Sequence, residues 1–258
     1  ACYPQLIKIA GGVPKKVRIY EEEGFQPDVS RIKAAVTPRT KAVLINSPAN
    51  PTGVVLDPSI LRDIASLGVP VISDEIYHGL IYSGEARTML EFKDDAITVN
   101  GFSKLYAMTG WRLGYVIVPE ALVRPVQKLQ QNLFISPSSI AQRAGVAAMR
   151  KGKGEVAGMV KEFGERRAML IEGLRNLGLS SSAEPSGAFY VFVNASKLSN
   201  DSLALAFDIL EKAHVAVTPG VDFGEGGEGY LRLSYATSPE NIDEGLRRLA
   251  TYIEENKK

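Results

Sequence analysis

Two basic residues lie in one polar segment where they could do chemistry. Lys104 and Arg112 fall within residues 100–114, between two predicted strands. A lysine held in a dry pocket has a lowered pKa, which frees its amine to act as a nucleophile. An arginine offers a planar fork of donors that suits a phosphate group. Taken alone, such a pair is more often two solvated surface cations.

An acid and a phenol follow the neighbouring predicted strand. Asp74 comes directly after the apolar run 69–73, and Tyr77 follows three residues later, in the sequence SDEIY. A carboxylate at the end of a buried strand is costly unless it has a partner. Ligands of α/β sheets bind outside the carboxyl ends of the strands, so both side chains are site candidates. An exposed acidic turn is equally compatible with these residues.

Two more segments carry candidate binding residues. Asn50 lies in the loop NSPANPTG after the apolar run 42–46, where two prolines and a glycine force an irregular path. Arg232 lies inside the strand-like run GYLRLSYA. A plain turn and a solvated strand face are the respective alternatives. If Arg232 instead faces an anion, its natural bidentate partner is a carboxylate.

The elements that must position these residues alternate between strands and helices, which predicts an α/β sheet with right-handed crossovers. The expected strands of this part are 42–46, 69–73, 96–99 and 114–118, with helices at 57–67 and 120–130. A long helical stretch over 140–177 is interrupted at 152–154, which is the best candidate for a domain junction. The later part predicts a smaller α+β domain, with strands at 189–193, 215–218 and 230–235 and helices at 202–213 and from 238 onward.

The four polar segments, in this order, resemble the signature of class I/II aminotransferases, the fold-type I pyridoxal-5′-phosphate enzymes. The matching motifs are SPANPTG, SDEIY, NGFSKLYAMTGWRLGY and GYLRLSYA. The resemblance runs along the whole chain. It implies a partial large cofactor-binding domain over residues 1–155, with a mostly parallel sheet, and a small α+β domain over 156–258.

The same resemblance implies a role for each matching residue. Lys104 matches the lysine that forms a Schiff base with the cofactor and then carries the α-proton. Asp74 matches the acid that pairs with the pyridine nitrogen and keeps the ring an electron acceptor. Asn50 and Tyr77 match the residues that bind the ring oxygen. Ser103 and Arg112 match contacts to the cofactor phosphate, and Arg232, with Asn50 beside it, matches the clamp for the substrate α-carboxylate.

The chain also departs from the family pattern. Gly101 stands three positions before the lysine, where the family often has a second hydroxyl residue. The chain begins without a methionine, and we expect that an N-terminal portion precedes it. The family's phosphate loop and ring-stacking aromatic would lie upstream, with Tyr3 just past the stacking position. We therefore expect this chain alone to bind the cofactor poorly.

Composition excludes several other classes. The 258 residues carry 30 Lys and Arg against 29 Asp and Glu, so bulk charge gives no reason to expect binding to nucleic acid. A single cysteine rules out a disulfide framework, and two separated histidines leave too few ligands for a zinc site. No apolar run reaches membrane-spanning length, so a cytoplasmic protein is expected. Residues 224–229 fit G-x-G-x-x-G by letter, but they precede a strand and carry two glutamates, which argues against a dinucleotide site.

The leading functional hypothesis is an amino-acid aminotransferase that moves an amino group to a 2-oxo acid. A carbon–sulfur β-lyase on the same scaffold would use the same lysine, acid and arginine. An aminotransferase-like effector domain of a transcription regulator and a fragment without a role of its own are further alternatives. The segment 130–137 lacks the arginine of some dicarboxylate-specific relatives, which weakens an aspartate-type assignment. A homodimer is implied by the resemblance.

Overall fold

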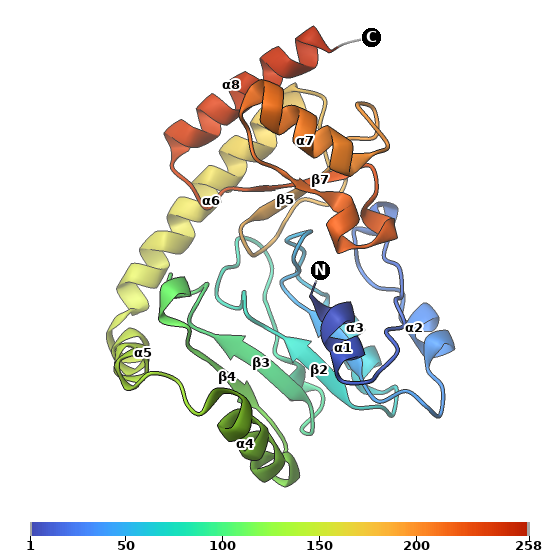
Figure 1. Cartoon of the computed structure of the whole chain (residues 1–258), viewed down its shortest axis with the longest axis vertical. Coiled ribbons are helices and arrows are strands. Elements are labelled where there is room, and N and C mark those ends of the chain that lie inside the picture. Colours follow the sequence, from blue (N-terminus) through green and yellow to red (C-terminus); the bar gives the residue numbers. More distant parts are fainter. Residues whose placement is uncertain (1, 257–258) are drawn as a thin grey trace.

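The first sheet is mostly parallel, as the sequence predicted. The computed structural model describes residues 2–256, and Figure 1 shows two sheets linked by helices. The strands of the first sheet stand in the order β1 (Val43–Asn46), β2 (Val71–Asp74), β3 (Ile97–Gly101) and β4 (Gly114–Ile117). β1, β2 and β3 run parallel, and β4 pairs antiparallel with β3. The α/β fold class is therefore confirmed.

The connection from β1 to β2 shows how local signals build this sheet. Helix α3 (Pro58–Ala65) begins where the sequence predicted, because the Asp57 side chain accepts a hydrogen bond from the Ser59 backbone N–H at 2.7 Å. Its Leu61 and Ile64 are 1% and 0% exposed and pack into a hydrophobic core that also contains Ile45 of β1 and Val71 of β2. The buried residues of this core are Ile32, Ile45, Leu56, Leu61, Ile64, Val71, Met89 and Ala96.

The second sheet is antiparallel and smaller. Its order is β5 (Tyr190–Asn194), β7 (Tyr230–Ser234) and β6 (Thr218–Pro219). Helices α7 (Ser202–Ala213) and α8 (Pro239–Glu255) lie beside it, and Figure 1 shows them at the top of the molecule. The predicted strand at 215–218 is shortened to its last residue plus Pro219. Pro219, which has no N–H for a ladder, ends this strand, and a 3-10 turn, η4 (Gly220–Phe223), follows at once.

The long helical stretch breaks where the glycines predicted. Helices α5 (Ser139–Lys151) and α6 (Lys153–Asn176) meet at Gly152, where an added Cβ would lie 2.6 Å from the Ala148 carbonyl oxygen. Helix α6 then runs along the side of the molecule to pack on α8 (Figure 1). Since α6 begins before residue 155 and continues past it, the division into residues 1–155 and 156–258 stays a prediction.

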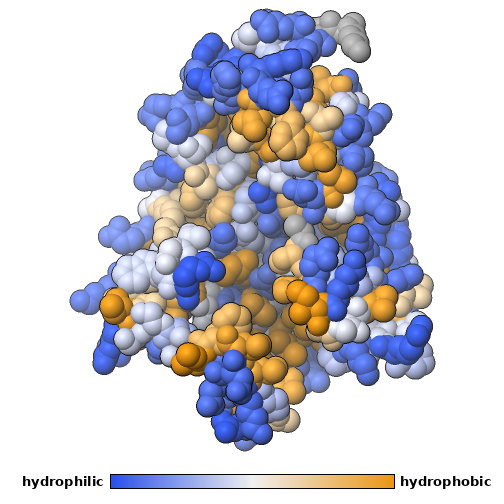
Figure 2. All heavy atoms as spheres, in the orientation of Figure 1, coloured by the Kyte–Doolittle hydropathy of each residue, from blue (hydrophilic) through white to orange (hydrophobic). Residues whose placement is uncertain are grey.

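The remaining elements connect these parts, and some of them carry exposed apolar side chains. They are α1 (Tyr3–Ile9), η1 (Glu21–Glu23), α2 (Val29–Ala35), η2 (Met89–Glu91), η3 (Thr109–Trp111), α4 (Glu120–Phe134) and η5 (Glu225–Gly227). Helix α4 continues four residues beyond the predicted end at 130. Apolar side chains of β4, α4 and α5 are exposed, and Figure 2 shows hydrophobic residues in the lower part of the molecule. The most exposed are Leu129, Leu133, Phe134, Ile140 and Met149.

Candidate active site

Three predicted site residues lie at one edge of the first sheet. Asp74 is the last residue of β2, and Asn50 and Lys104 lie in the loops that leave β1 and β3. Asn46 joins the first two: its side-chain N–H donates to the Asp74 carbonyl at 2.9 Å, and its Oδ1 accepts from the Asn50 backbone N–H at 2.8 Å. The parallel strands therefore bring together residues that are far apart in the sequence.

Arg232 reaches this edge from the second sheet. Its Nη1 donates to Asn50 Oδ1 at 2.8 Å, and its Nη2 donates to Thr218 Oγ1 at 3.0 Å. The guanidinium lies over the Tyr190 ring at 4.4 Å and over the Phe223 ring at 5.1 Å, within the range of cation–π attraction. Within residues 2–256 its buried Nε has no hydrogen-bond partner. An unsatisfied donor of this kind fits a ligand that accepts hydrogen bonds, such as a carboxylate.

Tyr77 makes a second connection between the sheets. It is 4% exposed, and its hydroxyl lies 3.1 Å from the hydroxyl of Tyr190 on β5. Burial raises the pKa of the Tyr77 phenol, the neighbouring Tyr190 raises it further, and the positive charge of Arg232 opposes both. The phenol is therefore held as a neutral hydrogen-bonding group.

Lys104 is half-buried beside the rings of Tyr77 and Phe189. Its Nζ lies 5.9 Å from the centre of the Tyr77 ring and 5.6 Å from that of Phe189. Burial lowers the pKa of the Lys104 amine, and the positive charges of Arg232 and Arg112 lower it further. All three influences favour the neutral amine, the form that acts as a nucleophile or accepts a proton.

Asp74 has a partner that the sequence did not assign to it. The Tyr3 hydroxyl donates to Asp74 Oδ2 at 2.5 Å, and the Ile76 backbone N–H donates to Asp74 Oδ1 at 3.1 Å. Tyr3 had been considered only for its closeness to the expected ring-stacking position. The structure instead makes it a hydrogen-bond donor to this carboxylate.

Ser103 and Arg112 are linked through Thr109. The Thr109 hydroxyl donates to the Ser103 carbonyl oxygen at 3.2 Å, and Arg112 Nη1 donates to the Thr109 carbonyl oxygen at 2.9 Å. Arg112 is exposed and has a positive φ of 52°. It borders an open cavity of about 740 Å³ whose other lining residues come mainly from α4, α5 and the loop between them. This cavity contains none of the other predicted site residues.

The departure at Gly101 has a local reason. A Cβ added to Gly101 would lie 3.1 Å from both the Gly114 Cα and the Leu113 carbonyl oxygen, because β4 runs close beside β3. Such contacts are tighter than most side chains tolerate, so a serine here would require the neighbouring strand to shift. Glycine allows the close approach of the two backbones.

Sequence reasoning missed three polar partners of the site: Tyr3, Tyr190 and Thr218. Tyr190 and Thr218 lie in predicted strands, where their side chains look like ordinary strand residues. The one available signal for Thr218 was its short distance in sequence from the GYLRLSYA motif. Strands that are close in sequence often pair in an antiparallel sheet, which would bring Thr218 near Arg232. The structure places Thr218 opposite Arg232 in that ladder.

The described residues fit pyridoxal phosphate. The cofactor needs an amine for its aldehyde, an anion for its ring nitrogen and donors for its ring oxygen, and Lys104, Asp74, Asn50 and Tyr77 offer these at one sheet edge. Along residues 2–256, no three His, Cys, Asp or Glu side chains gather as metal ligands. No helix in that stretch is both long enough and apolar enough to cross a bilayer.

Comparison with known proteins agrees with this donor set. The family model "Aminotransferase class I and II" matches residues 1–249. Aspartate/prephenate aminotransferase of Thermus thermophilus is 42% identical over 259 residues, which covers 97% of this chain and 66% of the relative. A Methanocaldococcus jannaschii protein named (5-formylfuran-3-yl)methyl phosphate transaminase is 41% identical over 257 residues, covering 98% of this chain and 66% of the relative.

Solved structures show the same similarity. The aspartate aminotransferase from Thermus thermophilus with maleate superposes with a TM-score of 0.91 at 41% identity, covering 96% of this chain and 66% of that one. A Pyrococcus protein superposes with a TM-score of 0.94 at 38% identity, covering 98% of this chain and 68% of that one. The chain thus spans about two thirds of the length of its relatives. By sequence and by fold, it belongs to the class I and II aminotransferase family.

Proposed function

We propose that this chain carries the catalytic lysine and the carboxylate clamp of a pyridoxal-phosphate-dependent amino-acid aminotransferase. One observation carries the proposal: Lys104, the Asp74–Tyr77 turn and the Arg232–Asn50 pair converge at a single sheet edge. The amine, the anion and the cation needed for this chemistry come from three separate parts of the sequence. Two solvated surface cations, the simpler interpretation of Lys104 and Arg112, would leave this convergence without an explanation.

Each side chain then has a distinct task. Bound pyridoxal phosphate supplies an electron sink beside the carbon that loses its proton. Lys104 Nζ takes the proton from the substrate α-carbon, a task for which the lowered pKa suits it. Arg232 holds the α-carboxylate so that the Cα–H bond faces this amine.

The other residues hold the cofactor. The Asp74 carboxylate would hold the ring nitrogen, where a negative charge favours a protonated ring. Asn50 and Tyr77 would donate to the ring oxygen, and Ser103 and Arg112 would bind the phosphate. The Tyr3 hydroxyl donates a hydrogen bond to Asp74 and therefore belongs to the same arrangement.

The substrates we propose are an α-amino acid and a 2-oxo acid. Similar relatives carry different substrate names, among them aspartate/prephenate aminotransferase and valine–pyruvate aminotransferase. The described residues therefore support the substrate class through the Arg232 clamp, and the side chain of the amino acid is left open. Amino transfer to a 2-oxo acid separates this function from a β-lyase, which would release pyruvate and ammonia without an acceptor.

The central test is covalent capture of the cofactor. We would add pyridoxal phosphate to the purified whole protein, reduce with borohydride and locate the added mass by peptide mapping. We expect the mass on Lys104, and we expect Lys104→Ala to remove it. Lys161→Ala is the matched control, since its side chain is 81% exposed. Labelling spread over surface lysines, with Lys104 no more reactive than the others, would contradict the proposal.

The proposal includes a homodimer in the cytoplasm. The exposed apolar side chains of α4 and α5 support an interface, because monomeric proteins rarely expose a large continuous apolar surface. Light scattering of the whole protein should give twice the mass of one chain, and Leu133→Glu with Phe134→Glu should lower it to one. A monomer at every concentration would refute this part. A fluorescent fusion tests the location.

A further inference from the structure

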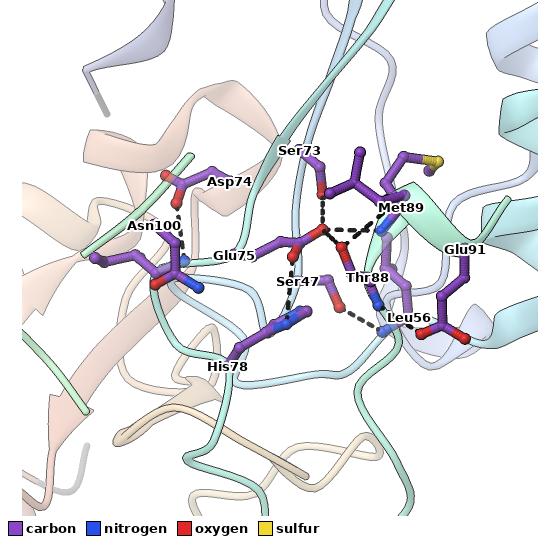
Figure 3. A network of polar contacts seen from close by, with 12 residues as sticks. Ser47, Leu56, Ser73, Asp74, Glu75, His78, Thr88, Met89, Glu91 and Asn100 are labelled. Atoms are coloured by element: carbon purple, nitrogen blue, oxygen red, sulfur yellow. Dashed lines mark hydrogen bonds and ion pairs between the residues drawn. The ribbon is translucent and has the colours of Figure 1, made fainter. Parts of the chain in front are cut away.

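Glu75 lies next to Asp74 but faces the opposite side of the chain. In Figure 3 the Asp74 carboxylate points toward Asn100, while the Glu75 carboxylate points toward Ser73, Thr88 and Met89. Glu75 is only 2% exposed. A buried carboxylate is costly unless donors surround it, so its setting needs a physical explanation.

One oxygen of Glu75 accepts three hydrogen bonds. Ser73 Oγ donates to Glu75 Oε1 at 2.9 Å, Thr88 Oγ1 at 3.1 Å and the Met89 backbone N–H at 2.9 Å. Two of these donors come from a turn that lies thirteen and fourteen residues further along the chain. Glu75 therefore ties the end of β2 to that turn.

The turn is itself a firm anchor. Thr88 caps η2 in a capping box with Glu91, and Glu91 pairs with Arg87. Met89 is 0% exposed and belongs to the core that contains Val71 of β2. A side chain bonded to this turn is thus held relative to the sheet itself.

His78 contacts the second oxygen of Glu75. His78 Nδ1 lies 3.4 Å from Glu75 Oε2, and the His78 backbone N–H donates to the Glu75 carbonyl at 2.9 Å. Burial lowers the pKa of His78, while the negative charge of Glu75, a hydrogen bond to the Ser47 backbone and, more weakly, the charge of Glu91 oppose this. A neutral ring beside an anion carries its proton on Nδ1. The buried Nε2 has no partner in the part of the chain that the structure describes.

The residues of this turn therefore fall into two pairs with different tasks. Asp74 and Tyr77 face the candidate active site, and Glu75 and His78 face the anchor behind it. We propose that Glu75 is a positioning residue that holds Asp74 and Tyr77 at the sheet edge, with His78 as its proton-bearing partner. The assignment of the front pair to cofactor binding rests on the proposed function; the anchoring itself does not.

The first experiment reads the tautomer of His78 by nitrogen NMR of the histidine-labelled chain at pH 7.5. The chain has two histidines, so His214 at the end of α7 serves as an internal reference. We expect the proton on Nδ1 in the wild type. Glu75→Gln keeps an oxygen for the three donors but turns an amide N–H toward Nδ1, so the proton should move to Nε2. An unchanged tautomer in Glu75→Gln would refute the contact.

The second experiment asks whether Glu75 acts through Asp74. Tyr3→Phe removes the hydroxyl that bonds Asp74. The loss in free energy of unfolding that Tyr3→Phe causes should be smaller by half or more in the Glu75→Ala background. In the Glu75→Gln background it should be restored. Tyr252→Phe is the matched control, because the Tyr252 hydroxyl bonds Asp208 at 2.5 Å far from this turn. Its effect should be the same in all backgrounds, since independent sites are additive.

These outcomes separate the inference from the proposed function. If Glu75→Ala does not fold, Ser73→Ala removes one of the three donors and tests the same coupling. If the losses in free energy of unfolding caused by Tyr3→Phe and by these changes are fully additive, the positioning role is overturned. Yield of borohydride-trapped pyridoxal phosphate at Lys104 should also drop about tenfold in Glu75→Ala and less than threefold in Glu75→Gln. Absence of trapping in the wild-type whole protein would refute the proposed function and leave the NMR and coupling results to decide the anchoring.

Discussion

Replacing Tyr3 by phenylalanine removes one hydroxyl and leaves the ring in place. That hydroxyl donates to Asp74 Oδ2 at 2.5 Å, and Asp74 keeps its other bond from the Ile76 N–H. Hydrogen bonds to charged groups contribute roughly 1.5–3 kcal/mol. Because the carboxylate retains one donor, we expect the free energy of unfolding at pH 7 to fall by about 1.5 kcal/mol, the lower end of that range.

The pH dependence of this loss follows from the Tyr3 phenol. Burial raises its pKa above the usual value, and the hydrogen bond and charge of Asp74 raise it further. The folded state then holds the phenolic proton more tightly than the unfolded state does. This contribution is fully present below about pH 10 and is lost as the pH rises beyond it, by at most about 1.4 kcal/mol per pH unit.

Urea unfolding from pH 7 to pH 11 measures both effects. Other tyrosines titrate alike in the wild type and in Tyr3→Phe, so the difference between the two isolates Tyr3. The difference in free energy of unfolding between the wild type and Tyr3→Phe should be constant up to about pH 10 and become smaller above it. Tyr20→Phe is the control, because Arg18 and Arg31 hold that ring by cation–π contacts. Equal stability at pH 7, or a gap that stays constant to pH 11, would refute the reasoning.

Three further predictions concern other parts of the site. Since burial lowers the pKa of Lys104, its acylation rate should reach half its maximum below pH 10.5, the value for an ordinary lysine; a midpoint at or above 10.5 would contradict this. Arg232→Lys keeps the charge but loses the fork, so steady-state kinetics of the whole enzyme should show KM for the amino acid raised about tenfold with a smaller change in kcat. Gly53→Ala should lower the free energy of unfolding by more than about 1 kcal/mol in a denaturant melt, because φ is +70° and the new Cβ would lie 2.4 Å from Pro185 Cβ; unchanged stability would show that this loop can yield.

Local signals allowed much of the fold to be predicted. Asp57 and Ser238 cap helices in the structure as their positions before proline indicated. The apolar run before Asp74 is long enough for a buried strand, which fixes Asp74 at the sheet edge. These features depend on residues within a few positions of each other, so the sequence displays them directly. The pairing of β4 antiparallel to β3 had no such local mark.

Contacts between distant segments could not be predicted in this way. Tyr190 sits among apolar and aromatic residues of β5, and nothing near it marks the hydroxyl that meets Tyr77. The Tyr3–Asp74 bond joins residues 71 positions apart. Both depend on how helices and sheets pack against each other, which the pattern of a single segment does not encode. The resemblance gave the identities of the front residues, whereas their supporting partners came from the structure.

Two of the polar contacts between the two sheets involve side chains proposed to bind substrate and cofactor. Arg232 donates to Asn50 across the gap, and Tyr77 meets Tyr190 there. A carboxylate that takes donors from the guanidinium changes the Arg232–Asn50 contact between the sheets, so we expect binding and the relative position of the sheets to be coupled. Substitutions at Asn50 or Tyr190 should therefore alter KM and stability together. Lys104, whose contacts with Tyr77 and Phe189 are only cation–π, should alter the chemistry with little effect on stability.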